Sequence, residues 1–121
     1  MWNAFIQDSR FRSTALFTEF SQRPLGFIDV GVRGGFHPLV APVAGITAAL
    51  GFEPDGEECI RLRERLAVQS PWAACTIEPY ALYHVDGPSL LHLLAQPTNH
   101  SLLPPNQPVV ERYGMKNWEE Q

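Results

Sequence analysis

Two stretches of the chain decide its fold, FIDVGVRGG at residues 27–35 and GFEPD at residues 51–55. Each is a short apolar run that ends beside a carboxylate, and the first run continues into a turn rich in glycine. Glu53 follows Gly31 by about 20 residues, the spacing at which α/β nucleotide folds place an acid on ribose hydroxyls. The pair therefore predicts two parallel strands whose ends could hold a nucleoside.

The composition is that of a single globular unit. The chain has 121 residues, of which 45% are hydrophobic and 18% are charged, enough for one buried core. Its 9 basic and 13 acidic residues give a formal net charge of -4. Because these charges are scattered, no basic stripe is offered to a phosphate backbone, and we expect no nucleic-acid partner.

Several absences in the sequence favour a cytoplasmic protein. The two cysteines, Cys59 and Cys75, are too few for a secreted disulfide framework. The first twenty or so residues lack the basic start and apolar core of a signal peptide. The uncharged run at residues 36–52 is shorter than the roughly 20 residues of a spanning helix and contains prolines, so no membrane contact is expected.

The alternation of apolar and polar residues predicts the order of helices and strands. A leading helix over residues 2–22, in a segment 1–23, comes before the sheet. The connection at residues 37–45 should be a short or broken helix, because Pro42 removes a backbone donor. A turn at Tyr83–Pro88, with its Asp-Gly signal, should add a β-hairpin between the third strand and residues 90–94. The predicted strands are residues 25–30, 46–52 and 73–82, and the fold class is α/β with a mainly parallel three-stranded sheet.

A helix should follow the second strand. Asp55 is placed to cap it, and Glu58, three residues on, could reach back to the Asp55 amide as a capping box. Glu57 and Arg61 form an i,i+4 pair worth only about 0.2–0.5 kcal/mol. This helix is therefore expected to depend on packing, and it should close at Gln69-Ser70-Pro71.

The residues of the glycine turn restrict which nucleotide cofactor could bind. Gly31, Gly34 and Gly35 allow a sharp bend and a close approach to a ligand. Arg33 stands where the dinucleotide fingerprint has its middle glycine, which argues against NAD or FAD. S-adenosylmethionine has a ribose for Glu53 and no pyrophosphate, so it tolerates Arg33. Asp29 could face its ammonium group or tie down loop amides, and the turn could also be a βα connection that binds nothing.

Four blocks of sequence resemble the FkbM-type S-adenosylmethionine-dependent methyltransferases. The resemblance covers roughly residues 25–113 and implies the cofactor-binding, N-terminal half of a class I, Rossmann-like methyltransferase domain, in the segment 24–121. It implies O-methylation of a sugar or a small natural product as acceptor. The blocks are FIDVGVRGG (27–35), GFEPD with EEC (51–59), PYAL (79–82) and SLLPPN (101–106).

The resemblance also implies roles for single residues. Asp29, Gly31 and the glycines Gly34 and Gly35 would line the methionine part of S-adenosylmethionine. Glu53 would accept hydrogen bonds from its ribose hydroxyls. Ala81 and Leu82, at the end of the third strand, would lie toward the adenine.

The family's fourth strand, with its acidic motif, and its acceptor-binding strands have no counterpart in this sequence. No catalytic base is identified, and the first strand becomes a sheet edge that needs a cover. The alternative is therefore a non-catalytic fragment or interaction module, in which two copies could pair through that open edge. No metal is expected, because the four histidines and two cysteines lack ligand spacing.

Overall fold

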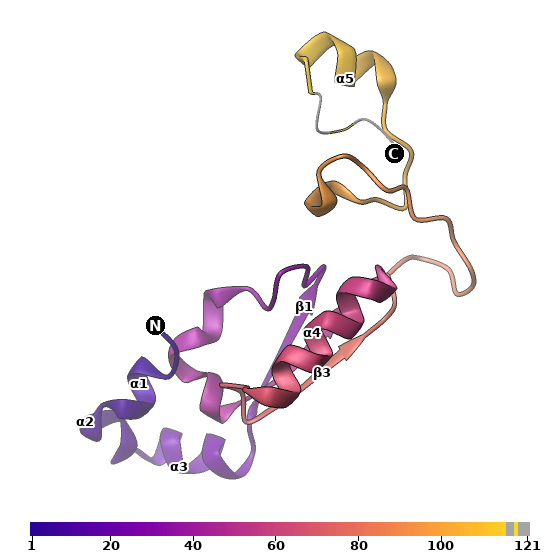
Figure 1. Cartoon of the computed structure of the whole chain (residues 1–121). Helices are drawn as coiled ribbons and strands as arrows, with labels where there is room; N and C mark the ends of the chain where they lie inside the picture. The colour runs from indigo at the N-terminus through magenta and orange to yellow at the C-terminus, as the bar shows by residue number, and fades with distance from the viewer. Residues whose placement is uncertain (116–117, 119–121) are drawn as a thin grey trace. The chain divides into compact units, whose positions relative to one another are not determined.

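The computed structural model of the protein describes residues 1–115 and 118, and the chain divides into two compact units. The first unit comprises Met1–Leu82 and the second begins at Tyr83. The first unit contains the sheet and its helices, while the second contains short helices and loops (Figure 1).

The first unit is built on three parallel strands, β1 (Leu25–Val30), β2 (Thr47–Phe52) and β3 (Ala74–Glu78), in the order β1-β2-β3. The α/β class and the parallel three-stranded sheet are thus confirmed. The strands are in register, with Val30 beside Phe52 and Phe52 beside Glu78, so their carboxyl ends lie at one edge. β3 ends before residue 82 because Pro79 has no amide for the ladder.

The connection from β1 to β2 is broken, as the sequence predicts. It is a 3-10 segment, η1 (Pro38–Ile46), which contains Pro42 and a non-helical residue at Val43. The Thr47 hydroxyl donates to the Val43 carbonyl at 2.9 Å and closes the segment onto β2. A regular crossover helix is therefore replaced by a shorter, irregular one.

The connection from β2 to β3 is a regular helix, α4 (Gly56–Val68). The Asp55 carboxylate caps it by accepting from the amides of Glu57 and Glu58, as expected. Cys59 and Leu62 are each 1% exposed and pack against one face of the sheet. The core on that face also contains apolar residues of the strands, the glycine turn, η1 and the loop before β3, namely Val32, Phe36, Ala44, Ala49, Trp72 and Ile77.

The opposite face of the sheet is less covered. Side chains alternate between the two faces along a strand, and on this face the β1 residues are exposed and those of β2 half-buried. Ile28 and Val30 are 64% and 58% exposed. Across the three strands the rows are Gly26-Ala48-Ala74, Ile28-Leu50-Thr76 and Val30-Phe52-Glu78.

The leading segment consists of three short helices, so the expectation of a single helix over residues 2–22 is wrong. They are α1 (Ala4–Gln7), α2 (Ser9–Arg12) and α3 (Ala15–Gln22). Asp8 and Thr14 interrupt the helix because their side chains accept from the following amides of Arg10 and Phe17. Asn3 fastens the segment to η1, donating to Ala41 and accepting from Gly45.

The second unit has no β-hairpin within its described residues, so that expectation is also wrong. Its helices are η2 (Pro97–Asn99) and α5 (Gln107–Tyr113). Leu90–Leu94 does not pair with the third strand, and its His92 forms an isolated antiparallel bridge to Ser101. Pro88 withholds one ladder donor at the predicted turn. No helix among the described residues is long and apolar enough to cross a bilayer.

Candidate functional site

The carboxyl edge of the sheet brings the glycine bend and the acid together, as the two sequence stretches predict. The amides of Gly31 and Val32 both donate to the Phe52 carbonyl, at 2.9 and 3.1 Å. The Glu53 amide donates to the Glu78 carbonyl at 3.0 Å and extends the β2-β3 ladder by one residue. The bend after β1 therefore lies directly beside the end of β2.

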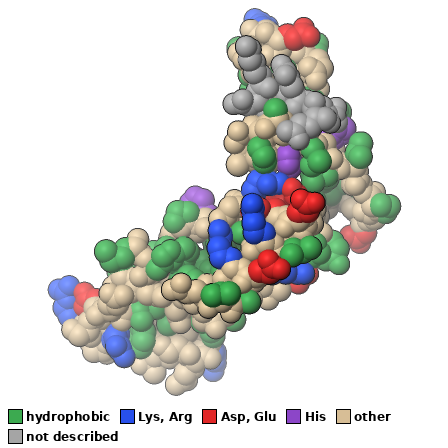
Figure 2. Space-filling model, viewed as in Figure 1, with side chains coloured by type: hydrophobic (Ala, Val, Ile, Leu, Met, Phe, Trp, Pro, Cys, Tyr) green, Lys and Arg blue, Asp and Glu red, His purple; other side chains and the backbone are tan. Residues whose placement is uncertain are grey.

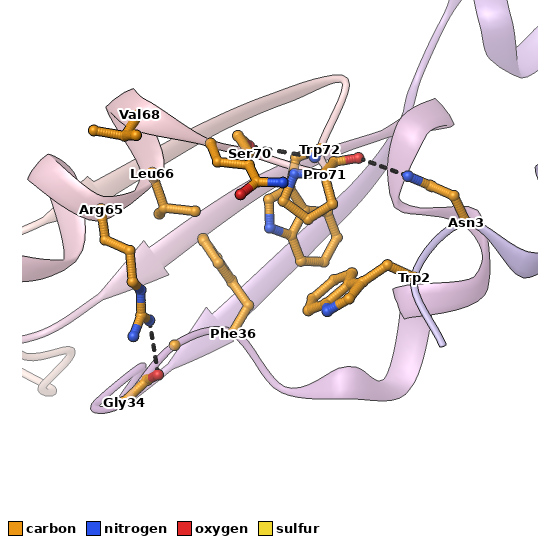
Figure 3. Close-up of a pocket in the computed structure, with 12 residues that line it drawn as sticks. Trp2, Asn3, Gly34, Phe36, Arg65, Leu66, Val68, Ser70, Pro71 and Trp72 are labelled. Atoms are coloured by element: carbon orange, nitrogen blue, oxygen red, sulfur yellow. Dashed lines mark hydrogen bonds between the residues drawn. The ribbon is translucent and has the colours of Figure 1, made fainter.

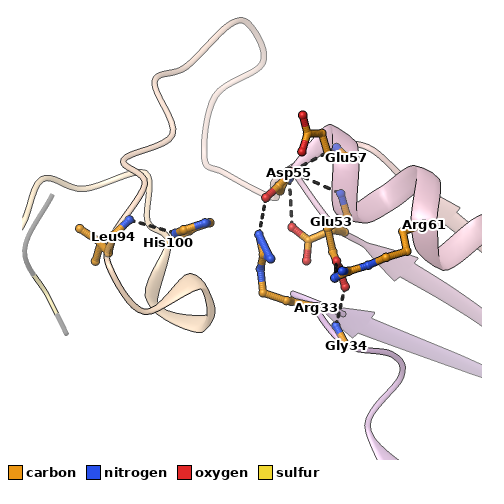
Figure 4. A network of polar contacts seen from close by, with 9 residues as sticks. Arg33, Gly34, Glu53, Asp55, Glu57, Arg61, Leu94 and His100 are labelled. Atoms are coloured by element: carbon orange, nitrogen blue, oxygen red, sulfur yellow. Dashed lines mark hydrogen bonds and ion pairs between the residues drawn. The ribbon is translucent and has the colours of Figure 1, made fainter. Parts of the chain in front are cut away.

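Glu53 is a buried carboxylate with one engaged oxygen. Its exposed fraction is 4%, and its Oε1 accepts from the Asp55 amide at 3.0 Å. Among the described residues, no donor is paired with Oε2. A carboxylate held in this way keeps one oxygen for a hydroxyl ligand. Figure 4 shows Glu53 within the polar network at the start of α4.

The glycine turn is fastened to α4 and its N-cap by three side-chain contacts. The Arg33 guanidinium forms an ion pair with Asp55, and both side chains are largely buried. Glu58 accepts from the Gly34 amide at 2.9 Å, and Arg65 donates to the Gly34 carbonyl at 2.8 Å. The loop conformation is thus fixed from the helix side.

Two details of the predicted helix start are wrong. The Asp55 amide is bound by Glu53 instead of Glu58, so the reciprocal half of the capping box does not form. Arg61 pairs with Glu58 at i,i+3 and not with Glu57. Both differences involve Glu58, whose buried side chain (3% exposed) points to the glycine turn and accepts from the Gly34 amide.

The turn presents almost no free amide. Gly31, Gly34 and Gly35 all have positive φ, which explains why glycine occupies them. Yet the amides of Gly31 and Val32 bind Phe52, that of Gly34 binds Glu58, and that of Gly35 binds the Val32 carbonyl at 2.8 Å. Phosphate sites need such amides to point at the ligand, so this turn is unsuited to a pyrophosphate.

Asp29 has the second of its two expected roles. Its Oδ2 accepts from the His37 amide at 2.6 Å and so holds the far end of the glycine loop. His37 in turn accepts from the Leu39 amide at the start of η1. Contact with a ligand ammonium remains a prediction.

Ala81 and Leu82 lie in the coil beyond β3, at the same edge of the sheet as Glu53. Ala81 is half-buried and Leu82 is 53% exposed. Their predicted position beside an adenine is not tested by the hydrogen bonds of the first unit. Contact of these two residues with an adenine stays a prediction, and only the strand order supports it.

The functional features that sequence reasoning missed are Glu58, Arg65 and a cavity of about 950 Å³ in the first unit. From the sequence, Glu58 is expected in a capping box and Arg65 has no predicted role, and only their contacts with Gly34 distinguish them. Along α4, basic and acidic side chains alternate over the surface (Figure 2). Within the described residues, no group of three or more His, Cys, Asp or Glu side chains could hold a metal ion.

The class of protein that these observations define is an α/β protein with an open, all-parallel sheet whose carboxyl edge carries a buried acid beside a glycine bend. The chain matches no family model, no curated protein and no solved structure. Assignment of a function therefore depends on the geometry of the chain itself.

Proposed function

We propose that the carboxyl edge of the sheet binds S-adenosylmethionine, as the cofactor-binding part of a methyltransferase that acts on an oxygen of a sugar or small metabolite. The observation that carries this proposal is Glu53, buried beside the bend at Gly31 with only one carboxylate oxygen engaged. The other oxygen is suited to accept from a ribose hydroxyl. Charged acceptors give short, strong hydrogen bonds in such positions.

The glycine turn supports this cofactor over a dinucleotide. A dinucleotide brings a pyrophosphate, which requires free amides, and those of Gly31, Val32, Gly34 and Gly35 already donate within the chain. S-adenosylmethionine brings a sulfonium and an ammonium, which carbonyl and carboxylate oxygens stabilise. The ion pair between Arg33 and Asp55 also removes the free cation that a phosphate would seek.

Methyl transfer from a sulfonium to oxygen is mainly an in-line displacement, so the protein contributes by positioning the two reactants. In the proposed complex Glu53 fixes the ribose, and the turn held by Asp29 and Glu58 fixes the methionine part. The turn is rigid before the ligand arrives, which reduces the entropy lost on binding. No base for the acceptor hydroxyl is assigned.

Calorimetric titration with S-adenosylhomocysteine tests the proposal. The wild-type chain should bind, and Glu53→Gln should weaken binding by at least about tenfold, because a charged hydrogen bond contributes about 1.5–3 kcal/mol. Glutamine keeps an oxygen for the Asp55 amide, so the fold should survive. Glu57→Gln, which changes an exposed acid in the first turn of α4, is the matched control and should bind like wild type. A folded chain that does not bind would exclude this function, and binding of NADH instead would indicate an oxidoreductase.

The second candidate is a non-catalytic interaction module. It is favoured by the exposed side chains of Ile28 and Val30 on β1, an edge strand whose outer backbone groups have no strand partner in the first unit. Pairing of two copies through this edge would give a dimer. Sedimentation of the chain over a range of concentrations, combined with a negative cofactor titration, would support this candidate.

A further inference from the structure

A cavity of about 950 Å³ lies in the first unit, away from Glu53. It is bounded by the leading segment, the glycine turn and the C-terminal end of α4 (Figure 3). Small-molecule sites occupy about 300–1,000 Å³, so the cavity can accept a ligand.

The walls of the cavity are aromatic. The ring centroids of Trp2 and Trp72 are 5.4 Å apart, and those of Phe36 and Trp72 are 5.1 Å apart, both in edge-to-face arrangements. Trp72 is 7% exposed, whereas Trp2 is 44% exposed. An indole left half open on the wall provides a surface on which a planar ring can pack.

Among the described residues that line the cavity, Arg65 is the one with a charged side chain. Among the described residues it has no carboxylate partner, and its one hydrogen bond is to the Gly34 carbonyl. Five other arginines each pair with an acid, and these pairs are Arg10–Asp8, Arg23–Glu19, Arg33–Asp55, Arg61–Glu58 and Arg63–Glu78. A guanidinium has five donors, so Arg65 keeps most of its donors for an anion.

The remaining polar groups of the lining further restrict which chemical groups a ligand could carry. Asn3 is used internally, since it donates to Pro71 and accepts from Gly45. The Ser70 hydroxyl accepts from the Trp72 amide. Gln69 adds an amide whose side chain has no protein partner among the described residues. Among the described lining residues, the side-chain donors without a protein partner are thus those of Arg65 and Gln69 and the indole N–H groups of Trp2 and Trp72, and no acidic side chain of this lining opposes them.

We propose that this cavity is a binding site for a small planar aromatic carboxylate. The ring packs among Trp2, Phe36 and Trp72, and the carboxylate accepts from Arg65 and Gln69. Carboxylates match the planar fork of a guanidinium better than a single-atom anion does. The site shares only the glycine turn with the proposed cofactor site and does not depend on it.

Calorimetry of the full chain with two matched probes tests this site. Naphthalene-2-carboxylate should bind, and naphthalene-2-methanol, which has the same rings without the charge, should bind at least about tenfold more weakly. Arg65→Gln should abolish this preference, because glutamine keeps a donor for Gly34 but has no charge. Arg23→Gln, which removes one charge from an exposed pair outside the cavity, should leave it unchanged.

A second variant addresses the aromatic wall. Trp2→Ala should weaken both probes, and because Trp2 is 44% exposed and lies outside the buried core cluster, the fold should survive. Equal binding of the two probes to the wild-type chain would overturn the proposal, as would a folded chain that binds neither. If circular dichroism shows that Arg65→Gln is unfolded, the preference of the wild-type chain between the two probes still tests the proposed site. Neither probe contains a nucleoside, so the outcome is independent of the cofactor titration.

Discussion

The two ends of α4 meet the same glycine turn with opposite chemistry. At its N-terminal end, Asp55 and Glu58 hold the turn by ionic and amide contacts around the buried Glu53. At its C-terminal end, Arg65 holds the Gly34 carbonyl at the rim of an aromatic cavity. The polar end joins residues 31–34 to residues 53–58, whereas the cavity assembles residues from position 2 to position 72. One loop can therefore serve two sites that attract different ligands.

The largest effect that separates the two ends should come from Trp72. Trp72→Ala removes a buried indole that contacts Trp2, Phe27 and Phe36, and such truncations lower the free energy of unfolding by about 3–5 kcal/mol. Urea denaturation followed by circular dichroism measures this loss. Trp2→Ala should cost clearly less because that side chain is 44% exposed, and equal losses would show that Trp72 does not anchor the core.

A smaller effect should come from Gly51, which lies between the two sites. A Cβ at Gly51 would lie 2.9 Å from Val32 Cγ1 and 3.0 Å from Phe36 Cε1. Overpacking of this kind costs about 1–3 kcal/mol, so Gly51→Ala should lower the denaturation midpoint.

The control for this prediction is Gly26→Ala in β1, where a Cβ would meet nothing within 4 Å. Replacing a strand glycine with space around it should leave stability unchanged or raise it by up to about 1 kcal/mol. If Gly51→Ala and Gly26→Ala shift the denaturation midpoint equally, the glycine turn does not pack tightly against β2.

The smallest effect is expected at Asp8, which is remote from both ends of α4. The side chain and the amide of Arg10 hydrogen-bond this carboxylate and lower its pKa below the ordinary value of 3.8. A carboxyl whose pKa is lowered on folding stabilises the protein above its unfolded pKa and loses that contribution as the pH falls through the folded pKa. NMR titration of Asp8 should show the lowered pKa, and Arg10→Gln should move it back toward 3.8.

Local patterns predicted the sheet of the first unit and the start of α4 well. Residues 25–30 and the Asp55 cap are found as expected because an apolar run or a capping carboxylate acts within a few residues. Pairing of the glycine bend with Glu53 followed from the parallel arrangement, in which carboxyl ends meet at one edge.

The features that the sequence did not predict are those in which a side chain or a strand has more than one possible partner. Glu58 could accept from the amide at its own helix start or from the Gly34 amide, and in the structure it accepts from Gly34. Asp8 and Thr14 divided an apolar rhythm that looks continuous. In the second unit, Leu90–Leu94 lacked a partner strand, so its apolar run alone did not specify a hairpin.

The sparsely charged rows of the sheet, with Ile28 and Val30 outermost, also bear on handling of the protein. A flat apolar surface next to an unpaired strand edge is a template for stacking and edge-to-edge growth. Concentrated solutions should scatter light increasingly on warming, because apolar association strengthens with temperature in this range. Ile28→Lys, on the edge strand, should keep the molecules apart and leave the buried side of the sheet unchanged, because Ile28 is exposed.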